Sequence, residues 1–271
     1  MAGSFILAGC GKMGGAMLDG WIEGGSATAG VHVIEPIGAA VKRFSGSPGV
    51  VLHETAASVP ADLSPAVVVL AVKPQTMDEA VRLLVRFVGP STVFLSIAAG
   101  KTIGYFESQL GFEAAIVRAM PNTPAAVGRG ITVYVPNERV TQEQNEMCEE
   151  LLSAIGEVIE VTDENLLDPV TAVSGSGPAY VFLLIEAMAA AGVKAGLPKN
   201  LAERLARATV AGAGELARLS DEDAAQLRKN VTSPGGTTAA ALKVLMADDG
   251  IQPVFDRALA AATNRSRELA G

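Results

Sequence analysis

Histidine and cysteine are scarce in this chain of 271 residues, which contains two of each. His32 and His53 are too few for a histidine-rich metal site, and their scarcity disfavours a catalytic triad centred on histidine. Cys10 and Cys148 cannot form a disulfide scaffold, and neither has the spacing of a metal ligand. The chemistry of this chain must therefore come from other residue types, and the cytosol is the expected compartment.

Positive charge and long apolar runs are also in short supply. The chain has 29 acidic and 21 basic residues, a net charge of −8, and no block of basic residues. Nucleic acid and anionic lipid are therefore disfavoured as partners. A bilayer span needs roughly 20 apolar residues, whereas the run at residues 179–185 ends at Glu186. The apolar N-terminal stretch has no basic residue before it, so we expect a soluble, cytoplasmic protein without a signal peptide.

The first part of the chain alternates short β-branched runs with helical segments. Apolar residues make up 49% of the chain and charged residues 18%, which favours a packed core over disorder. The run at residues 66–72 is apolar without alternation, which is typical of a strand covered on both faces. Repetition of strand and helix predicts a parallel sheet with helices on both faces. The predicted elements are strands at residues 4–8, 31–34, 66–72, 92–97, 115–119, 131–135 and 158–161, and a helix at residues 12–23.

After about residue 161 the pattern changes from strands to helices. The stretch at residues 202–219 is rich in alanine and glycine, and such small side chains suit a packed bundle or a subunit interface. We therefore predict an α/β fold with a Rossmann-type dinucleotide-binding domain at residues 1–162 and an all-α domain at residues 163–271. The predicted helices are residues 179–193, 199–219, 221–229, 237–247 and 253–269.

A glycine loop follows the first predicted strand and opens the first predicted helix. Its residues are Gly9, Cys10, Gly11, Lys12, Met13 and Gly14, which fit the G-x-G-x-x-G pattern in the required context. The glycines permit a tight turn and close approach of a pyrophosphate, whose charge the helix N-terminal amides would hold. An ordinary glycine turn is the alternative.

Glu35 stands at the end of the second predicted strand, about twenty residues beyond the glycine loop. An acid at this place usually accepts hydrogen bonds from the ribose hydroxyls, favours NAD and repels a 2′-phosphate. Pro36 follows at once, and the alternative is a solvated carboxylate at a strand end.

Other loops with polar or turn-forming residues follow strands or precede helices. Residues 71–74, 96–100 and 120–124 follow successive strands, and ligands of open α/β sheets bind beyond the carboxyl ends of strands. Residues 174–178 and 231–238 are dense in hydroxyls and glycine and precede helices, which suits a small carboxylate. Turn chemistry could explain each loop of the first group alone, but their position at successive strand ends favours a functional role. Helix capping explains the second group equally well.

Five of these segments occur in the same order in the pyrroline-5-carboxylate reductase family, which the chain closely resembles over essentially its whole length. They are the glycine loop, Ala71-Val72-Lys73-Pro74, Met120-Pro121-Asn122-Thr123-Pro124, residues 174–180 (SGSGPAY) and residues 233–238 (SPGGTT). The last two are quite specific to the family, and the glycine loop is not. The resemblance implies reduction of 1-pyrroline-5-carboxylate to L-proline with NADPH or NADH, the last step of proline biosynthesis.

The resemblance also implies an assembly and a set of site residues. The helical domain of the family interlocks with a second subunit, and the homodimers often assemble into decamers of five dimers. The hydroxyl of Thr238 is expected to bond the ring nitrogen as the catalytic group. The family usually prefers NADPH, a preference that Glu35 opposes here. The expected substrate residues are Glu164, Asn230, Ser233, Gly235, Gly236, Thr237 and Thr238, and the further cofactor residues are Val72, Lys73, Pro74, Ala98, Ala99, Gly100 and Asn122.

Hydride transfer to a protonated imine needs little from a protein beyond positioning, which suits a site without histidine, cysteine or metal. The β-hydroxyacid dehydrogenases share the two-domain plan but resemble G-x-x-G-x-G-x-x-x-K, with the lysine as acid and base. Here Gly175 and Gly177 fit the pattern but Val181 occupies the lysine position, which disfavours alcohol oxidation. Reduction of another cyclic imine and a dinucleotide sensor without turnover are further alternatives, and the hydroxyl-rich loop argues against the sensor.

Overall fold

The computed structural model describes residues 3–270 and divides into two compact units. The first contains the chain up to Gly175 together with the segment from Ala262 onward, and the second is Ser176–Ala261. The last strand ends at Glu160, close to the predicted change from strands to helices. The division into compact units falls later in the chain than the predicted domain boundary between residues 162 and 163. That boundary stays a prediction.

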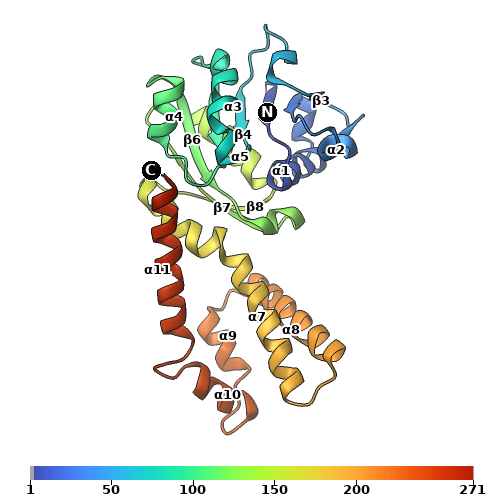
Figure 1. Ribbon diagram of the computed structural model, residues 1–271, viewed down its shortest axis with the longest axis vertical. Coiled ribbons are helices and arrows are strands. Elements are labelled where there is room, and N and C mark those ends of the chain that lie inside the picture. The colour runs from blue at the N-terminus through green and yellow to red at the C-terminus, as the bar shows by residue number, and fades with distance from the viewer. Residues whose placement is uncertain (1–2, 271) are drawn as a thin grey trace. The chain divides into compact units, whose positions relative to one another are not determined.

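The first unit is built on an eight-stranded sheet of order β3-β2-β1-β4-β5-β6-β7-β8 (Figure 1). All neighbouring strands pair in parallel except β6 and β7, which are antiparallel. The predicted parallel sheet is thus confirmed, with one antiparallel pairing that the sequence did not indicate. The strands are β1 (Phe5–Ala8), β2 (Val31–Ile34), β3 (Val50–His53), β4 (Val67–Leu70), β5 (Val93–Ser96), β6 (Ala115–Met120), β7 (Gly130–Pro136) and β8 (Gly156–Glu160).

The reversal at β7 follows from the length of the connection before it. Between Met120 and Gly130 the chain makes only the 3-10 turn η6 (Thr123–Val127). A parallel crossover needs a dozen or more residues, usually a helix, whereas antiparallel neighbours can be joined by a short segment. The connection is too short to return the chain to the other end of the sheet, so β7 runs backwards.

The edge strand β3 was not predicted, because the strand has only four residues and none of them is fully buried. It pairs with β2, and the two histidines of the chain meet across this pair. His32 Nδ1 lies 2.9 Å from His53 Nε2, and the rings stack. Burial lowers the pKa of both imidazoles, and the neighbouring His53 lowers that of His32 further.

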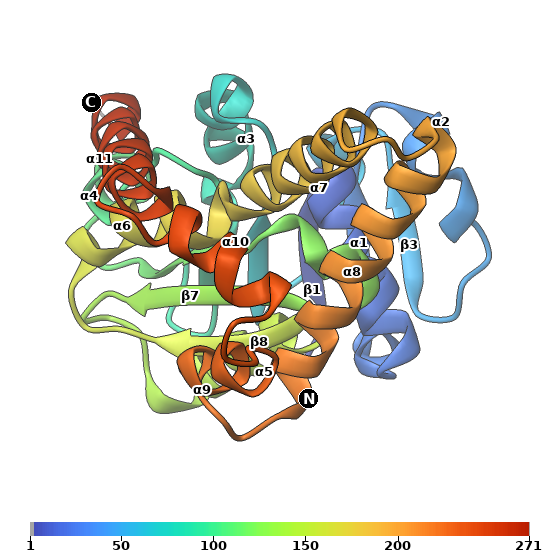
Figure 2. The same cartoon turned by 90° about the horizontal axis from the view of Figure 1, so that it is seen from below.

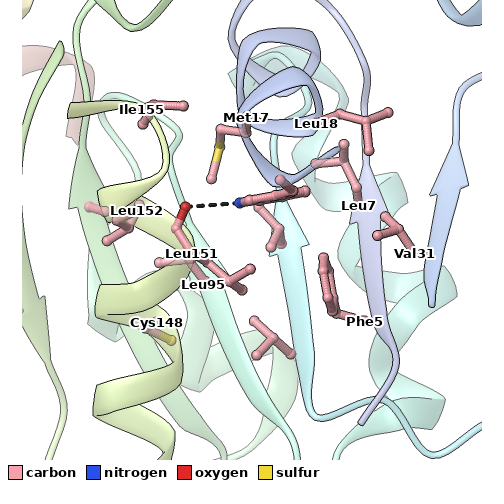
Figure 3. Packing of buried hydrophobic residues seen from close by; sticks show 14 of the residues in the cluster. Phe5, Leu7, Met17, Leu18, Val31, Leu95, Cys148, Leu151, Leu152 and Ile155 are labelled. Carbon is pink, nitrogen blue, oxygen red and sulfur yellow. Dashed lines mark hydrogen bonds between the residues drawn. The ribbon is translucent and has the colours of Figure 1, made fainter. Parts of the chain in front are cut away.

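Helices cover both faces of the sheet, as predicted. On one face, α1 (Lys12–Glu23) and α5 (Gln142–Ser153) pack over the side chains of Phe5 and Leu7. On the other face, α3 (Met77–Leu84) and α4 (Ile103–Leu110) pack over the alternate residues of the same strand. Fully buried Trp21 on α1 donates its indole N–H to the carbonyl oxygen of Leu151 on α5 at 2.8 Å (Figure 3). This bond joins the two helices above the sheet.

The helices after β8 agree closely with the sequence expectation. In the second unit, α7 and α8 lie side by side as a hairpin (Figure 1, Figure 2). Small residues allow this approach, since a Cβ on Gly192 would lie 3.3 Å from the Cβ of Ala202. The remaining helices of the chain are α2 (Gly38–Val41), α6 (Leu167–Val170), the π-helix η8 (Thr171–Gly175), α7 (Gly177–Lys194), α8 (Lys199–Leu219), α9 (Ala224–Asn230), α10 (Thr237–Leu245) and α11 (Ile251–Ala270).

Helix α7 is apolar on all sides but is mostly exposed in the single chain. Phe182 is 60% exposed and Leu183 is 63% exposed, and Ala189 is the only residue of α7 that is buried. By length and composition alone, the stretch Glu164–Lys194 could cross a membrane, and 6% of its apolar window is buried. A helix that is apolar all round is normally covered by other protein or by lipid, so α7 requires a cover that the single chain does not supply.

Candidate active site

The predicted cofactor loops share one edge of the sheet. Strands β1, β2, β4 and β5 pair in parallel, so their carboxyl ends lie next to one another. The N–H of Gly9 donates to the carbonyl oxygen of Ile34 at 2.9 Å, and that of Ala71 donates to Ala8 at 2.8 Å. The glycine loop, Glu35 and the loops after β4 and β5 are thereby held together at the edge where ligands of such sheets bind.

Two glycines of the glycine loop are needed for packing. Gly9 has a φ of +92°, and a Cβ on it would lie 2.8 Å from the backbone of Ala71. A Cβ on Gly14 would collide with the carbonyl oxygen of Gly9. These close approaches bring α1 against the ends of β1 and β4, and they would be required whether or not a ligand binds.

Gly11 is different, because nothing lies within 4 Å of where its Cβ would be. It caps α1 without a side-chain hydrogen bond, and the first turn of the helix contains no acidic residue. Lys12 is exposed and Met13 is half-buried against the core. The open space and the uncapped amides at the start of α1 are suited to an anion, and an ordinary glycine turn would need neither.

The carboxylate of Glu35 is fixed at the same place. One oxygen accepts the backbone N–H of Cys10 at 2.8 Å, and the other accepts that of Ile37 at 3.0 Å. Glu35 is 9% exposed, so the alternative of a solvated carboxylate at a strand end does not hold. The carboxylate bridges the glycine loop and the chain that follows β2.

The thiol of Cys10 is buried beside this carboxylate. Burial raises the pKa of Cys10 to about 11, with a further contribution from the charge of Glu35. Burial alone raises the pKa of Cys148 on α5. Both thiols are therefore protonated near neutral pH and are unsuited to nucleophilic work.

The loops after β4 and β5 carry further residues that were predicted to contact the cofactor. Val72 is half-buried and Lys73 is exposed at the start of the 3-10 turn η4 (Pro74–Thr76). After β5, Ala98 is buried, Ala99 is exposed, and Gly100 adopts a φ of +74°. A Cβ on Gly100 would lie 3.0 Å from the carbonyl oxygen of Leu269, so the end of α11 packs directly on this loop.

Asn122, which was predicted to contact the cofactor, is committed to the fold on both sides of its amide. Its Nδ2 donates to the carbonyl oxygen of Ser174 at 3.1 Å, and its Oδ1 accepts from the N–H of Ile131 at 3.0 Å. The side chain thus ties the β6–β7 connection to the π-helix η8. One amide hydrogen and one lone pair are left for a ligand, so its cofactor role stays a prediction.

Glu164 is organised by a residue that the sequence reasoning missed. Its Oε1 accepts the N–H of Ile103 at the start of α4 at 2.8 Å and pairs with Arg118 at 2.7 Å. The Arg118 side chain is 6% exposed in the middle of β6. A lone arginine in an otherwise apolar strand was the available signal, because a buried cation needs a partner. The structure shows how Glu164 is positioned, and its proximity to substrate stays a prediction.

The hydroxyl-rich loop of the second unit leads into α10. The N–H of Gly236 donates to the carbonyl oxygen of Ser233 at 3.0 Å, and Gly235 adopts a φ of +72°. Gly236 caps the helix without a side-chain hydrogen bond, and Thr237 and Thr238 are its first residues. Helix capping by the loop hydroxyls, which was the alternative, is not what this loop does. Its amides stay available for a carboxylate.

Asn230 ends α9 just before this loop. Its Nδ2 donates to Glu222 at 2.8 Å, and its Oδ1 accepts from Gln226 at 2.7 Å. The cofactor loops and Glu164 therefore belong to the first unit, while Asn230 and the hydroxyl-rich loop belong to the second.

The segment at residues 174–180 begins with an unusual backbone. Thr171–Gly175 form a π-helix in which Ser174 Oγ donates to the carbonyl oxygen of Val170 at 2.9 Å. A Cβ on Gly175 would lie 2.6 Å from the terminal methyl group of Met120, so a larger residue there would require the Met120 side chain to move. Single π-turns often occur at functional sites, and nothing in the sequence announced this one.

The chain matches known proteins along most of its length. Residues 164–269 match the family model described as pyrroline-5-carboxylate reductase dimerisation, and residues 4–100 match the one described as NADP oxidoreductase, coenzyme F420-dependent. The pyrroline-5-carboxylate reductase of Pseudomonas aeruginosa is 40% identical over 262 residues, which cover 97% of this chain and 95% of the relative. The chain belongs to the pyrroline-5-carboxylate reductase family.

Solved structures agree with this assignment. The pyrroline-5-carboxylate reductase of Coxiella burnetii superposes with a TM-score of 0.91 at 35% identity, and all of both chains is covered. The pyrroline carboxylate reductase of Plasmodium falciparum, solved with NADP bound, superposes with a TM-score of 0.79 at 29% identity and covers 99% of this chain and 98% of its own. Family membership therefore supersedes the β-hydroxyacid dehydrogenase alternative.

Proposed function

We propose that this chain reduces 1-pyrroline-5-carboxylate to L-proline with NADPH or NADH, the last step of proline biosynthesis. The similarity to pyrroline-5-carboxylate reductases over 97% of the chain carries the proposal. The two uncapped helix N-termini, at Gly11 and Gly236, supply what the two anionic reactants require. A sensor without turnover would not need the second of them.

The first unit would hold the dinucleotide. The amides from Gly11 to Gly14 are suited to its pyrophosphate, because the helix dipole and the open space above Gly11 both favour an anion. Glu35 would accept the ribose hydroxyls, and the loops after β4 and β5 would line the nicotinamide. When bound, the dinucleotide supplies the hydride. The nicotinamide contacts are assigned to Val72, Lys73, Pro74, Ala98, Ala99, Gly100 and Asn122.

The second unit would hold the imine. Ser233, Gly235, Gly236 and Thr237 are suited to its carboxylate, since amides and hydroxyls gather there without competing acids. Thr238 would hydrogen-bond the ring nitrogen and so hold or deliver the ring proton. With the carboxylate and the nitrogen both fixed, one ring carbon is presented for reduction, which is the positioning that hydride transfer requires. We place Glu164 and Asn230 near the same substrate.

The test is direct. Purified protein is mixed with 1-pyrroline-5-carboxylate and either reduced dinucleotide, and consumption of the dinucleotide and formation of proline are both measured. We expect one molecule of proline to form for each molecule of reduced dinucleotide that is consumed. Other cyclic imines, with and without a carboxylate, serve as matched substrates. Failure to form proline, or equal rates with an imine that lacks the carboxylate, would refute the assigned substrate.

We further propose that the chain is a homodimer that assembles into a decamer of five dimers in the cytoplasm. The dimerisation model spans α7, whose exposed apolar surface needs a cover. A second copy is the better cover than lipid, since Glu186 lies within α7 and the hairpin partner α8 is polar over much of its length. The net charge of −8 disfavours nucleic acid and anionic membranes. We keep the domain boundary between residues 162 and 163, just before the start of the matched dimerisation region.

A multimeric mass in light scattering without detergent is the expected result for this assembly. A monomer at micromolar concentration, or a protein that stays soluble only in detergent, would contradict it.

A further inference from the structure

The carboxylate of Glu35 is held in one orientation at the end of β2. Its two oxygens accept different backbone N–H groups, from Cys10 in the glycine loop and from Ile37 beyond β2. Because the side chain is 9% exposed and bound at both oxygens, it cannot swing away from an incoming ligand without breaking two hydrogen bonds. The charge is part of the fixed wall of the dinucleotide site.

The remaining hydrogen-bonding capacity of this carboxylate suits a diol. A carboxylate offers about four lone-pair sites, and the two backbone amides use one on each oxygen. One site on each oxygen is left, which matches the adjacent 2′- and 3′-hydroxyls of an adenosine ribose. A 2′-phosphate has no hydrogen to donate when ionised, and it would bring negative charge against the fixed carboxylate.

An arginine close to the first turn of α1 is already engaged. Binding of a 2′-phosphate at this place generally uses an arginine. Arg43 is the candidate, since its guanidinium lies 3.1 Å from where a Cβ of Gly15 would be. It pairs with Asp19 at 2.6 Å and lies over the ring of Phe44 at 4.3 Å. Recruiting Arg43 for a phosphate would break these contacts, although an exposed ion pair such as this one contributes little.

We infer that Glu35 sets the cofactor preference of this chain to NADH over NADPH, by accepting both ribose hydroxyls and by excluding the 2′-phosphate. The inference rests on the proposed function only for the reaction in which the dinucleotide is used. Its binding part can be measured without any imine. It departs from the matched NADP oxidoreductase family model and from the Plasmodium relative that was solved with NADP.

The first measurement is the affinity of the unaltered protein for NADH and for NADPH, from fluorescence titration without imine. We expect NADH to bind about tenfold or more tightly than NADPH. The ribose hydroxyls of NADH would gain hydrogen bonds to Glu35, whereas the 2′-phosphate of NADPH would meet its like charge. The ratio of kcat/KM with 1-pyrroline-5-carboxylate should follow the same order. Equal binding, or tighter binding of NADPH, would overturn the inference even if proline is formed. If NADH binds more tightly but no proline is formed, the proposed function fails and the inference about the nucleotide stands.

The second measurement uses variants of Glu35. Glu35→Ser removes the charge and shortens the side chain, so the preference should move toward NADPH by about tenfold or more. Glu35→Gln keeps the length and one acceptor oxygen, and it serves if the serine variant does not fold. Glu54→Ser is the matched control, because Glu54 directly follows β3 as Glu35 follows β2 but is exposed. The control should leave the preference within about twofold, since a solvated charge at a distance is screened.

A preference that is unchanged in a folded Glu35 variant would overturn the assignment of Glu35. An equal shift in Glu54→Ser would also overturn it, because general charge rather than the fixed carboxylate would then set the preference.

Discussion

The helix starts at Gly11 and Gly236 look alike locally but are supported very differently. Each begins α1 or α10 with a glycine cap in extended conformation, without a side-chain cap and without an acidic residue in the first turn. Helix α1 buries Met17, Leu18 and Trp21 in the core, whereas α10 buries no residue in the single chain. The proposed dinucleotide end is thus held by the core of its own unit, whereas the helix at the proposed substrate end has no such support.

Removing the core beneath α1 should have the largest effect. Trp21→Ala deletes a fully buried indole and its hydrogen bond to Leu151. We expect the first unit to lose about 3–5 kcal/mol of stability, measured by denaturant unfolding. Trp21→Phe, which keeps most of the apolar volume, should cost less. A truncation on α10, Leu245→Ala at a residue 50% exposed in the single chain, should cost clearly less. Equal losses of stability from the α1 and α10 variants would contradict the proposed difference in how the two helices are supported.

The next effect tests the chemistry at the start of α10. Thr238→Ala removes the hydroxyl assigned to the ring nitrogen and should lower turnover about tenfold or more, with NAD(P)H affinity nearly unchanged. A positioning bond to a protonated imine gives less than the 10²–10⁴-fold that is typical of general acid catalysis. Thr238→Ser should recover most of the activity. The neighbouring variant Thr237→Ala should act mainly on the KM for the imine.

An unchanged rate in Thr238→Ala would make Thr238 an ordinary residue of a helix start. A parallel loss of dinucleotide affinity would show that the two ends are not separable.

A smaller effect should come from exposing the substrate end by breaking the dimer. Leu183→Glu places a charge on the apolar surface of α7, at a residue 63% exposed in the single chain. We expect a smaller mass in light scattering and a several-fold fall in imine reduction, because a buried unpaired charge is costly at an interface. NADH affinity should persist, since the first unit holds that site alone. Val127→Glu, at a residue of the first unit that is 74% exposed, is the control and should keep the mass. A Leu183→Glu dimer with full activity would refute the role assigned to this surface.

The contrast between the two units also explains what the sequence could reveal. Elements with a strong local pattern could be predicted from the sequence. The bounds of α1 and α8 are as predicted, and the apolar runs of β1, β4 and β5 are strands. The edge strand β3 escaped because half-exposed positions carry little apolar pattern. The direction of β7 depends on the short connection between β6 and β7. Which strand β7 pairs with is set by tertiary packing, which the local sequence does not show.

Site residues followed the same rule. Glycine spacing and the position of Glu35 after β2 were legible, because backbone geometry and strand ends are local properties. The bonds from Glu35 to Cys10 and from Arg118 to Glu164 join residues far apart in the chain. Such contacts exist only once the sheet brings the strand ends together. Which hydroxyls of residues 233–238 would be free of capping could likewise be seen only in the structure.

The smallest effect should come from the two cysteines. Cys10 occupies a variable position of the glycine loop, and its backbone N–H, not its thiol, makes the contact with Glu35. Burial, with a contribution from Glu35, raises the pKa of the Cys10 thiol from 9.0 to about 11, so almost no thiolate exists at neutral pH. The double variant Cys10→Ala, Cys148→Ala should therefore keep its turnover within about threefold; a loss beyond about tenfold, or 1.4 kcal/mol of barrier, would indicate a thiol mechanism.

The same thiol gives a signed dependence on pH. Since folding raises the pKa of Cys10, its contribution to stability is complete below pH 9 and is lost as the pH rises toward 11. Unfolding titrations of the parent should show this loss. Cys148→Ala retains Cys10 and should keep the part of the loss that Cys10 causes, whereas Cys10→Ala should keep only the part caused by the buried Cys148, whose pKa is also raised. The dinucleotide end would then be the more sensitive of the two helix starts to alkaline pH, because α10 has no cysteine in or beside it. If the parent and the double variant lose dinucleotide affinity equally at alkaline pH, ionisation of the thiols is not the cause of that loss.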